Sequence, residues 1–450
     1  MKTIFITSFH IYISRNLFYT DFLPTLLESD KLRIIILVPN DKKRYFEVHF
    51  GGPQVVIEGI PFGTLSSIYT LSLLMKRAAK YALNSNSARI ERRRKLILDH
   101  KWLYFIAISL LATLVSSNRF FRRIMRTIDY YISQKGRFDF LFDKYNPDLI
   151  VLTDMLNERD VEVLQAAKQR KVKTLGMVRS WDNLTLHGLM RALPDDLIVH
   201  GSRVKELAEQ LNDMPGEKIH ITGIPHYDNY VKKPILSRDN FLRQIGLDPS
   251  KRTVLFAPIS DHYLRGNDAD PYVFELLGKM PWQVIVRFSP SLNVAGLTDA
   301  KPFPKMYIDR PNLQLAEASG ELPKVADDDL INEVLASDVV LCGPSSIVMD
   351  AMTMGKPVVI LALHRSPKSY LEGVYYRYDY DHFKFLLDCG AARMAKTVDE
   401  LKLHIETYMK NPSFDEEGRK KFLDAYAGLR DGQSGRRAAS VIKSLLFIEK

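Results

Sequence analysis

The sequence contains few cysteines, no long apolar run and none of the common cofactor motifs. Only two of its 450 residues are cysteines, Cys342 and Cys389, which are too few for a disulfide framework or a thiolate metal site. Gly-x-Gly-x-x-Gly, Walker, His-Glu-x-x-His and zinc-spacing motifs are absent, so the protein classes that they mark are not indicated. The apolar run within Met1–Ser8 is too short for a signal peptide. These absences favour a cytoplasmic protein with reduced cysteines.

The positive charge is concentrated in one block. The net charge is +10, yet residues 76–126 alone hold 13 Lys and Arg against 2 acids, so the rest of the chain is close to neutral. Nucleic-acid binding would need a broader basic surface and a recognisable motif, and we expect neither.

The same block, residues 65–130, interrupts the pattern of the first half. It contains an uncharged stretch of 14 residues, Trp102–Val115, between the basic run Arg89–Lys95 and four further arginines. A bilayer span needs about 20 apolar residues, so this stretch is too short to cross. An apolar helix flanked by arginines predicts an interfacial segment on an anionic membrane, here the inner face of the cell membrane. The alternative is a buried helix with a solvated basic face.

Short runs of Ile, Val and Leu alternate with helical patterns and predict parallel sheets covered on both faces. Two Rossmann-like α/β domains are expected, over residues 1–230 and 240–400, with a linker at Val231–Ser237. Charged helices over 401–450 follow and can return toward the first domain. The expected strands are Thr3–Thr7, Arg33–Val38, Leu149–Thr153, Thr174–Val178, Leu197–His200, Thr253–Ala257, Gln283–Arg287, Val339–Leu341 and Val358–Leu361.

The most informative motif runs from Leu341 to Asp350. An apolar strand meets a turn at Gly343 and Pro344, and two serines, Ser345 and Ser346, stand where a helix begins. Free N–H groups and serine hydroxyls at a helix start can hold an anion. Asp350 follows Ser346 by four residues, on the same helix face, where a carboxylate can accept hydrogen bonds from ribose hydroxyls. The alternative is an ordinary strand–helix–strand unit with a serine N-cap.

This motif resembles the donor-binding loop of GT-B glycosyltransferases. The likeness is greatest to the bacterial surface-polysaccharide branch related to CDP-glycerol glycerophosphotransferases and UDP-GlcNAc 2-epimerases. The resemblance implies two Rossmann-like domains facing a cleft, with Ser345 and Ser346 at the donor's phosphates and Asp350 at its ribose. The segment Gly223–Asp228, Gly-Ile-Pro-His-Tyr-Asp, resembles the stretch that ends the first domain in this group.

Two further segments resemble the nucleotide domain of these transferases. The run Leu255–Pro258 resembles its first strand, which implies that Ser260 in the following loop contacts the donor. Ile285–Pro290 resembles a strand ending that more often reads Arg-x-His-Pro, but Ser289 stands where that histidine would be. This difference argues against a mechanism that depends on a histidine at this place. Arg287 remains a candidate phosphate clamp, with a structural ion pair as the alternative.

A second polar patch, Arg179–Gly188, follows a predicted strand of the first domain. Ligands bind at the carboxyl ends of strands in open α/β sheets, and Ser-Trp-Asp-Asn-Leu-Thr resembles a signature of surface-carbohydrate transferases. Trp181 would stack on a sugar, Asn183 would bind acceptor hydroxyls, and Asp154 would line the same site. The alternative is an Asx-turn beside a core tryptophan.

The catalytic base is not fixed by any one motif. In inverting GT-B enzymes a base often lies after the first strand, which implies His10; Asp182 and His262 are rivals. Asp268-Ala269-Asp270 matches an Asp-x-Asp metal pattern, but GT-B enzymes usually need no metal, so neither a metal nor a cofactor is expected.

Together these features predict a peripheral, cytoplasmic, metal-independent glycosyltransferase. It would move a sugar from a nucleotide-sugar donor to a lipid-linked or glycan acceptor in surface polysaccharide biosynthesis. One alternative is a CDP-glycerol or CDP-ribitol type polyol-phosphate transferase. Another is an inactive GT-B module that only binds.

Overall fold

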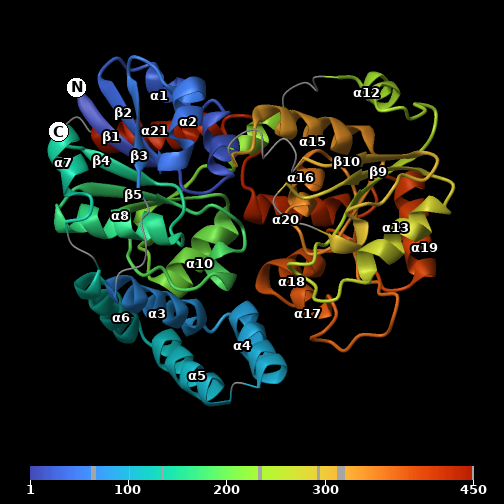
Figure 1. Ribbon diagram of the computed structural model, residues 1–450, viewed down its shortest axis with the longest axis horizontal. Helices are drawn as coiled ribbons and strands as arrows, with labels where there is room; N and C mark the ends of the chain where they lie inside the picture. The colour runs from blue at the N-terminus through green and yellow to red at the C-terminus, as the bar shows by residue number, and fades with distance from the viewer. Residues whose placement is uncertain are drawn as a thin grey trace. The chain divides into compact units, whose positions relative to one another are not determined.

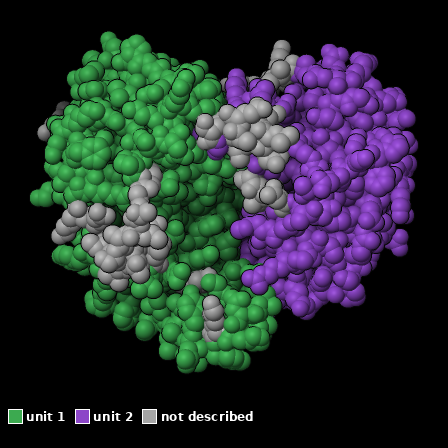
Figure 2. Space-filling model, in the orientation of Figure 1, with its two compact units in different colours: residues 1–228, 425–450 green, residues 229–424 purple. Residues whose placement is uncertain are grey.

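The computed structural model describes residues 1–61, 67–100, 102–133, 136–231, 236–290, 294–311 and 320–447. Most of the expected linker Val231–Ser237 lies outside these ranges, as do residues 65, 66 and 101 of the 65–130 block. The chain forms two compact units (Figure 2), Met1–Asp228 with Ala425–Lys450, and Asn229–Asp424.

The first unit is built on a parallel sheet of seven strands. Their order is β3-β2-β1-β4-β5-β6-β7, and every pairing between them is parallel. Five of the strands confirm the predicted apolar runs, and β3 and β7 were not predicted. The strands are β1 (Lys2–Thr7), β2 (Leu32–Pro39), β3 (Val55–Ile60), β4 (Leu149–Leu152), β5 (Lys173–Met177), β6 (Asp196–Val199) and β7 (Ile219–Ile221).

Helices cover both faces of this sheet (Figure 1). Strand interiors such as Ile4, Ile34 and Val151 are fully buried, which explains the lack of polar alternation in their sequences. The covering helices are α1 (Phe22–Leu27), α2 (Lys43–Phe50), α7 (Asp139–Tyr145), α8 (Glu158–Gln169), α9 (Asn183–Leu186), α10 (Ser202–Asn212) and α21 (Ser434–Leu446).

The C-terminal helix α21 belongs to the first unit, where it lies beside α1 and β1 (Figure 1). Ala438, Ala439 and Ile442 are buried in the core formed by β1, β2 and α1. The helix start is fixed by Asp228, whose carboxylate accepts hydrogen bonds from the amides of Ser434 (3.0 Å) and Gly435 (2.8 Å). The aspartate that ends the Gly223–Asp228 segment thus ties the end of the chain to the first sheet.

Four helices between β3 and β4 form an insertion. They are α3 (Ser67–Ala82), α4 (Asn86–Asp99), α5 (Trp102–Ser117) and α6 (Arg119–Ile132). A small core of its own joins Ala79, Ala82, Val115 and Met125 to Leu189 of the sheet domain.

Several arginines of the insertion make buried structural contacts. Arg122 donates two hydrogen bonds to Asp213 (2.7 and 2.6 Å) and Arg126 donates a third (3.0 Å). Arg92 is buried and donates to the carbonyl of Leu83 (2.8 Å). These guanidinium groups fasten helices, and the remaining cations of the block carry its surface charge.

The second unit holds a parallel sheet of six strands in the order β10-β9-β8-β11-β12-β13. Four strands were predicted, and β10 and β13 were not. The strands are β8 (Thr253–Ala257), β9 (Gln283–Arg287), β10 (Met306–Asp309), β11 (Val339–Cys342), β12 (Val358–Leu361) and β13 (Arg393–Ala395). Its helices are α11 (Asp228–Val231), α12 (Arg238–Gln244), α13 (Ala269–Gly278), α15 (Lys324–Ala336), α16 (Ile347–Thr353), α17 (Tyr375–Tyr378), α18 (Asp381–Asp388), α19 (Val398–Lys410) and α20 (Glu416–Tyr426).

The packing of α21 gives a stability prediction. Ile442 is fully buried in the first unit's core, so Ile442→Ala removes packed methyl groups and leaves a cavity. We expect the free energy of unfolding to fall by roughly 2–5 kcal/mol in chemical denaturation. The neighbouring Lys443 forms only an exposed ion pair with Glu28 (3.1 Å), so the control Lys443→Ala should cost less than about 1 kcal/mol. Equal effects of the two changes would contradict the assigned role of α21.

Candidate functional site

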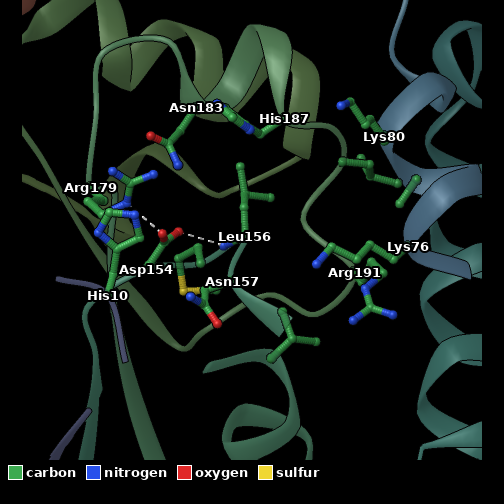
Figure 3. Close-up of a pocket in the computed structure, with 14 residues that line it drawn as sticks. His10, Lys76, Lys80, Asp154, Leu156, Asn157, Arg179, Asn183, His187 and Arg191 are labelled. Carbon is green, nitrogen blue, oxygen red and sulfur yellow. Dashed lines mark hydrogen bonds and ion pairs between the residues drawn. The ribbon is translucent and has the colours of Figure 1, made fainter. Parts of the chain in front are cut away.

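Three strands of the first sheet end around one pocket (Figure 3). His10 follows β1, Asp154 follows β4, and Arg179 and Asn183 follow β5. All four side chains line a cavity of about 240 Å³. The carboxyl ends of parallel strands lie at one edge of a sheet, where α/β proteins bind ligands. Three of the residues predicted from the sequence, His10, Asp154 and Asn183, therefore meet here.

The His10 imidazole is held in its neutral form. Burial, and next the charge of Arg179, lower its pKa from 6.5 to about 4. The Tyr12 amide donates to Nδ1 over 3.4 Å, a long contact. A neutral imidazole can take a proton near neutral pH. If His10 accepts that proton at Nε2, the neutral ring must carry its own hydrogen on Nδ1, and the contact with the Tyr12 amide must then be lost.

Asp154 and Arg179 form an ion pair beside His10. Arg179 Nε donates to Asp154 Oδ2 at 2.6 Å, and the Leu156 amide donates to Asp154 Oδ1 at 3.0 Å. Because both carboxylate oxygens are occupied, Asp154 is fixed in direction and sets the position of the guanidinium at the pocket wall.

A carboxylate–imidazole pair lies at the same pocket. Asp182 Oδ2 is 3.3 Å from His187 Nε2, and Ser180 Oγ donates to Asp182 Oδ1 at 2.6 Å. His187 lines the cavity. Asp182 was predicted as a candidate base, whereas His187 was not; the only sequence signal for His187 is its position five residues after Asp182, across the short helix α9. A carboxylate that holds one ring nitrogen can leave the other as a base.

Trp181 and Asn183, the two other residues predicted to bind the acceptor, are both buried, but only Asn183 lines the cavity. Trp181 is 5% exposed and packs edge-on against Tyr426, with ring centroids 5.8 Å apart. The ring therefore occupies the core of the first unit, as in the alternative interpretation, and offers no face for stacking. Asn183 is 2% exposed, lines the cavity, and its side-chain oxygen has no hydrogen-bond partner among the described residues.

The predicted donor loop joins β11 to α16 in the second unit. A Cβ on Gly343 would lie 2.2 Å from Ile259 Cγ1, so only glycine allows the loops after β8 and β11 to pack this closely. Pro344 and Ser345 are half-buried and Ser346 is exposed. Ser346 is the N-cap of α16 but its side chain makes no capping bond. Both serine side chains thus stand at the carboxyl edge of the second sheet.

Asp350 is buried on α16, and Tyr230 donates a hydrogen bond to its Oδ1 (3.0 Å). A ribose contact would have to use the remaining acceptor capacity of this carboxylate.

Arg287 lies inside the second unit. Its guanidinium is 2.6 Å from Asp309 and 2.8 Å from Glu333 and also donates to the Ala326 carbonyl. Arg287 is 5% exposed, and burial raises the pKa of Glu333 to about 8. Arg287 was interpreted either as a phosphate clamp or as part of a structural ion pair. These buried contacts favour the structural ion pair, and we do not propose a phosphate clamp at Arg287.

Ser260 and His262 follow β8. The carboxylate of Asp270 accepts hydrogen bonds from the amides of Ile259 (2.9 Å) and Ser260 (3.1 Å). Ser260 is buried with a φ of +80°, a left-handed conformation that L-residues adopt only when other contacts impose it. The side chain of His262 is exposed. Asp270 thus shapes this loop beside Gly343.

The two aspartates of the Asp-x-Asp pattern serve separate contacts. Asp268 bonds to His364 Nδ1 (3.0 Å) and to the Ser366 hydroxyl (2.7 Å), whereas Asp270 faces the loop after β8. Across the described ranges of the chain, no group of three His, Cys, Asp or Glu side chains could hold a metal ion.

The Arg287 cluster gives a test that separates its two interpretations. Arg287→Ala would leave the Asp309 carboxylate buried without its cation, and we expect about 3–5 kcal/mol lower unfolding free energy. Arg252→Ala removes an exposed guanidinium from Asp338 and should cost under about 1 kcal/mol. A variant that kept its stability but lost nucleotide affinity in calorimetry would instead identify a phosphate clamp.

Structural comparison supports the fold. UDP-GlcNAc 2-epimerase from Neisseria meningitidis, solved with UDP-GlcNAc, aligns with a TM-score of 0.56 and 10% identity, over 99% of this chain and 100% of that one. The enzyme of the same name from Methanocaldococcus jannaschii aligns with a TM-score of 0.53 and 12% identity, over 98% and 99%. These identities show the fold alone, which is the predicted α/β architecture of GT-B type.

A variant of the wall teichoic acid polymerase TagF gives a TM-score of 0.49 at 10% identity, over 99% of this chain and 89% of that one. A search of curated protein sequences found no match. A family model for CDP-glycerol:poly(glycerophosphate) glycerophosphotransferases matches residues 157–444, more than half of the chain and parts of both units. The chain therefore belongs to the CDP-glycerol:poly(glycerophosphate) glycerophosphotransferase family.

Proposed function

We propose that this protein transfers a polyol phosphate, such as glycerol phosphate, from a CDP-activated donor to an acceptor hydroxyl during surface polymer synthesis. The observation that carries the proposal is the family match over residues 157–444, which favours polyol-phosphate transfer over sugar transfer. The built pocket at the edge of the first sheet argues against a module that only binds the donor.

The donor would bind the second unit at the loop between β11 and α16. Ser345 and Ser346 would donate hydrogen bonds to the diphosphate, and Asp350 would accept one from ribose. This assignment is supported by the uncapped, exposed side chain of Ser346 and by the close packing of Gly343 on Ile259.

The acceptor hydroxyl would enter the pocket of the first unit. In the reaction its oxygen attacks the phosphorus that bears the polyol; a new P–O bond forms, the diphosphate P–O bond breaks, and CMP leaves. The hydroxyl proton passes to a base, for which neutral His10 and the Asp182–His187 pair are the candidates on the pocket wall. Positioning and stabilisation of the leaving phosphate would supply most of the rate enhancement.

The insertion would bring this pocket to an anionic membrane surface. By length and composition, no single helix in the described part of the chain could cross a bilayer; Trp102–Ser116 and Arg119–Ile132 qualify only as a pair bent by 112°. Both helices of this pair expose large apolar side chains, including Leu103 (85%), Leu110 (62%) and Phe120 (61%). An exposed apolar face of this extent, beside a strongly basic block, suits interfacial binding to anionic lipid.

The transferase proposal can be tested through His10. With CDP-glycerol and a membrane lipid extract, His10→Gln should lower the transfer rate by about 10²–10⁴-fold if this imidazole is the base. Because the pKa of His10 is about 4, the wild-type rate should fall as pH drops through that value rather than through 6.5. His187→Gln is the parallel variant. If it alone abolishes transfer and His10→Gln is active, the base is the Asp182–His187 pair; no transfer by wild type under any condition argues against the proposal.

The membrane assignment can be tested by sedimentation with anionic vesicles. The double change Leu103→Asp with Leu110→Asp places two carboxylates on the exposed face of α5 and should abolish cosedimentation, since buried carboxylates oppose insertion. Val48→Asp, at a side chain that is 73% exposed on α2, is the matched control and should still bind. Equal binding by all three proteins would reject α5 as the contact surface.

A further inference from the structure

The insertion helix α3 forms one wall of the first unit's pocket, and its position is fixed by a glycine. Gly188 has a φ of +112°, and a Cβ there would lie 2.5 Å from Lys80 Cα and 2.7 Å from the Ala79 carbonyl oxygen. The Leu189 amide donates to that carbonyl at 3.0 Å. A larger residue than glycine would push α3 outward, so the sequence allows this helix to contact the segment directly after His187.

This wall carries two lysines. Lys76 and Lys80 of α3 line the cavity with Arg191, opposite His10, Arg179 and Asp154 (Figure 3). Both lysine side chains are exposed to solvent at the cavity. A bound anion could therefore reach both side chains from solvent.

The arginines of the pocket are held by carboxylates at hydrogen-bond distance, whereas Lys76 is held less closely. Arg179 bonds to Asp154 at 2.6 Å, and Arg191 bonds to Asp129 at 3.0 Å and Glu158 at 2.6 Å. Lys76 is 3.7 Å from Glu158, beyond hydrogen-bond length. An ammonium has three donors, so Lys76 retains capacity for the oxygens of a ligand.

A second observation points to a ligand in this cavity. Asn183 is 2% exposed, and its side-chain oxygen is buried with no partner among the described residues. A buried acceptor of this kind is costly unless something donates to it. An acceptor hydroxyl would supply that donor at the pocket that also holds His10 and His187.

We propose that this pocket binds a phosphate group of the acceptor, with Lys76 and Lys80 holding the phosphate oxygens while a neighbouring hydroxyl donates to Asn183. This proposal rests on the proposed function and places the phosphate of its acceptor at α3, beside Asn183. Two sources share the chemistry: a polyol-phosphate terminus and the diphosphate of a lipid carrier. The same insertion exposes the apolar faces of α5 and α6, so a membrane-anchored acceptor and its phosphate would meet one structural element.

Calorimetric titration of the full chain can test this site. The probes are glycerol 3-phosphate and geranyl diphosphate, with glycerol as the uncharged comparison and CDP as a probe of the second unit. The variants are Lys80→Gln and Lys76→Gln, and Lys31→Gln is the control because it removes an exposed lysine at the opposite, amino end of β2. Thermal melting of each variant establishes that it is folded.

We expect the phosphate probes to bind wild type while glycerol does not. Each pocket variant should weaken phosphate binding by roughly tenfold to a hundredfold, because it removes a charge-assisted hydrogen bond. Lys31→Gln should bind as wild type does, and CDP affinity should be the same in all four proteins. Preference for glycerol 3-phosphate or for geranyl diphosphate identifies the source of the phosphate.

Absence of phosphate binding, or equal affinity in the pocket variants and Lys31→Gln, would overturn this proposal even if CDP binds. Failure of CDP to bind, with phosphate binding intact, would instead count against the proposed transferase function.

Discussion

Parallel strand pairing determines where the chemistry of this protein can occur. In the first sheet β1 lies between β2 and β4, and β5 follows β4, all in the same direction. His10, Asp154 and Arg179 are far apart in the sequence, yet each follows one of these strands. The pairing brings them to one edge, where burial limits access to water and the polar side chains must satisfy one another or a ligand.

The sheets were predictable because strands buried on both faces appear as runs of Ile, Val and Leu. The missed strands lack this signal: β3 contains Glu58 and Gly59, β7 and β13 are three residues long, and β10 reads Met-Tyr-Ile-Asp. The site was only partly predictable. Motifs and strand ends identified Asp154 and Asn183. The roles of Trp181 and Arg287 depend on their burial, which the motifs do not reveal. Three further pocket residues come close only through tertiary contacts that no local pattern shows: His187, Lys76 and Lys80.

The basic block shows how one composition serves several purposes. Arg122 and Arg126 share Asp213 and fasten α6, whereas Lys76 and Lys80 line the pocket and the exposed apolar residues of α5 and α6 face outward. Charge counting alone treats these cations as equivalent. The close approach of α3 to Gly188 makes the insertion a wall of the pocket. The same insertion carries the exposed apolar faces of α5 and α6, which are the proposed membrane contact.

The released nucleotide tests the central claim most directly. Transfer of a polyol phosphate breaks the diphosphate and releases a nucleoside monophosphate, whereas transfer of a sugar from a nucleotide-sugar releases a nucleoside diphosphate. With CDP-glycerol and a membrane lipid extract, phosphorus NMR should detect CMP forming in step with acceptor-bound glycerol phosphate. Turnover of a nucleotide-sugar with release of UDP or GDP, and none of CDP-glycerol, would contradict the account.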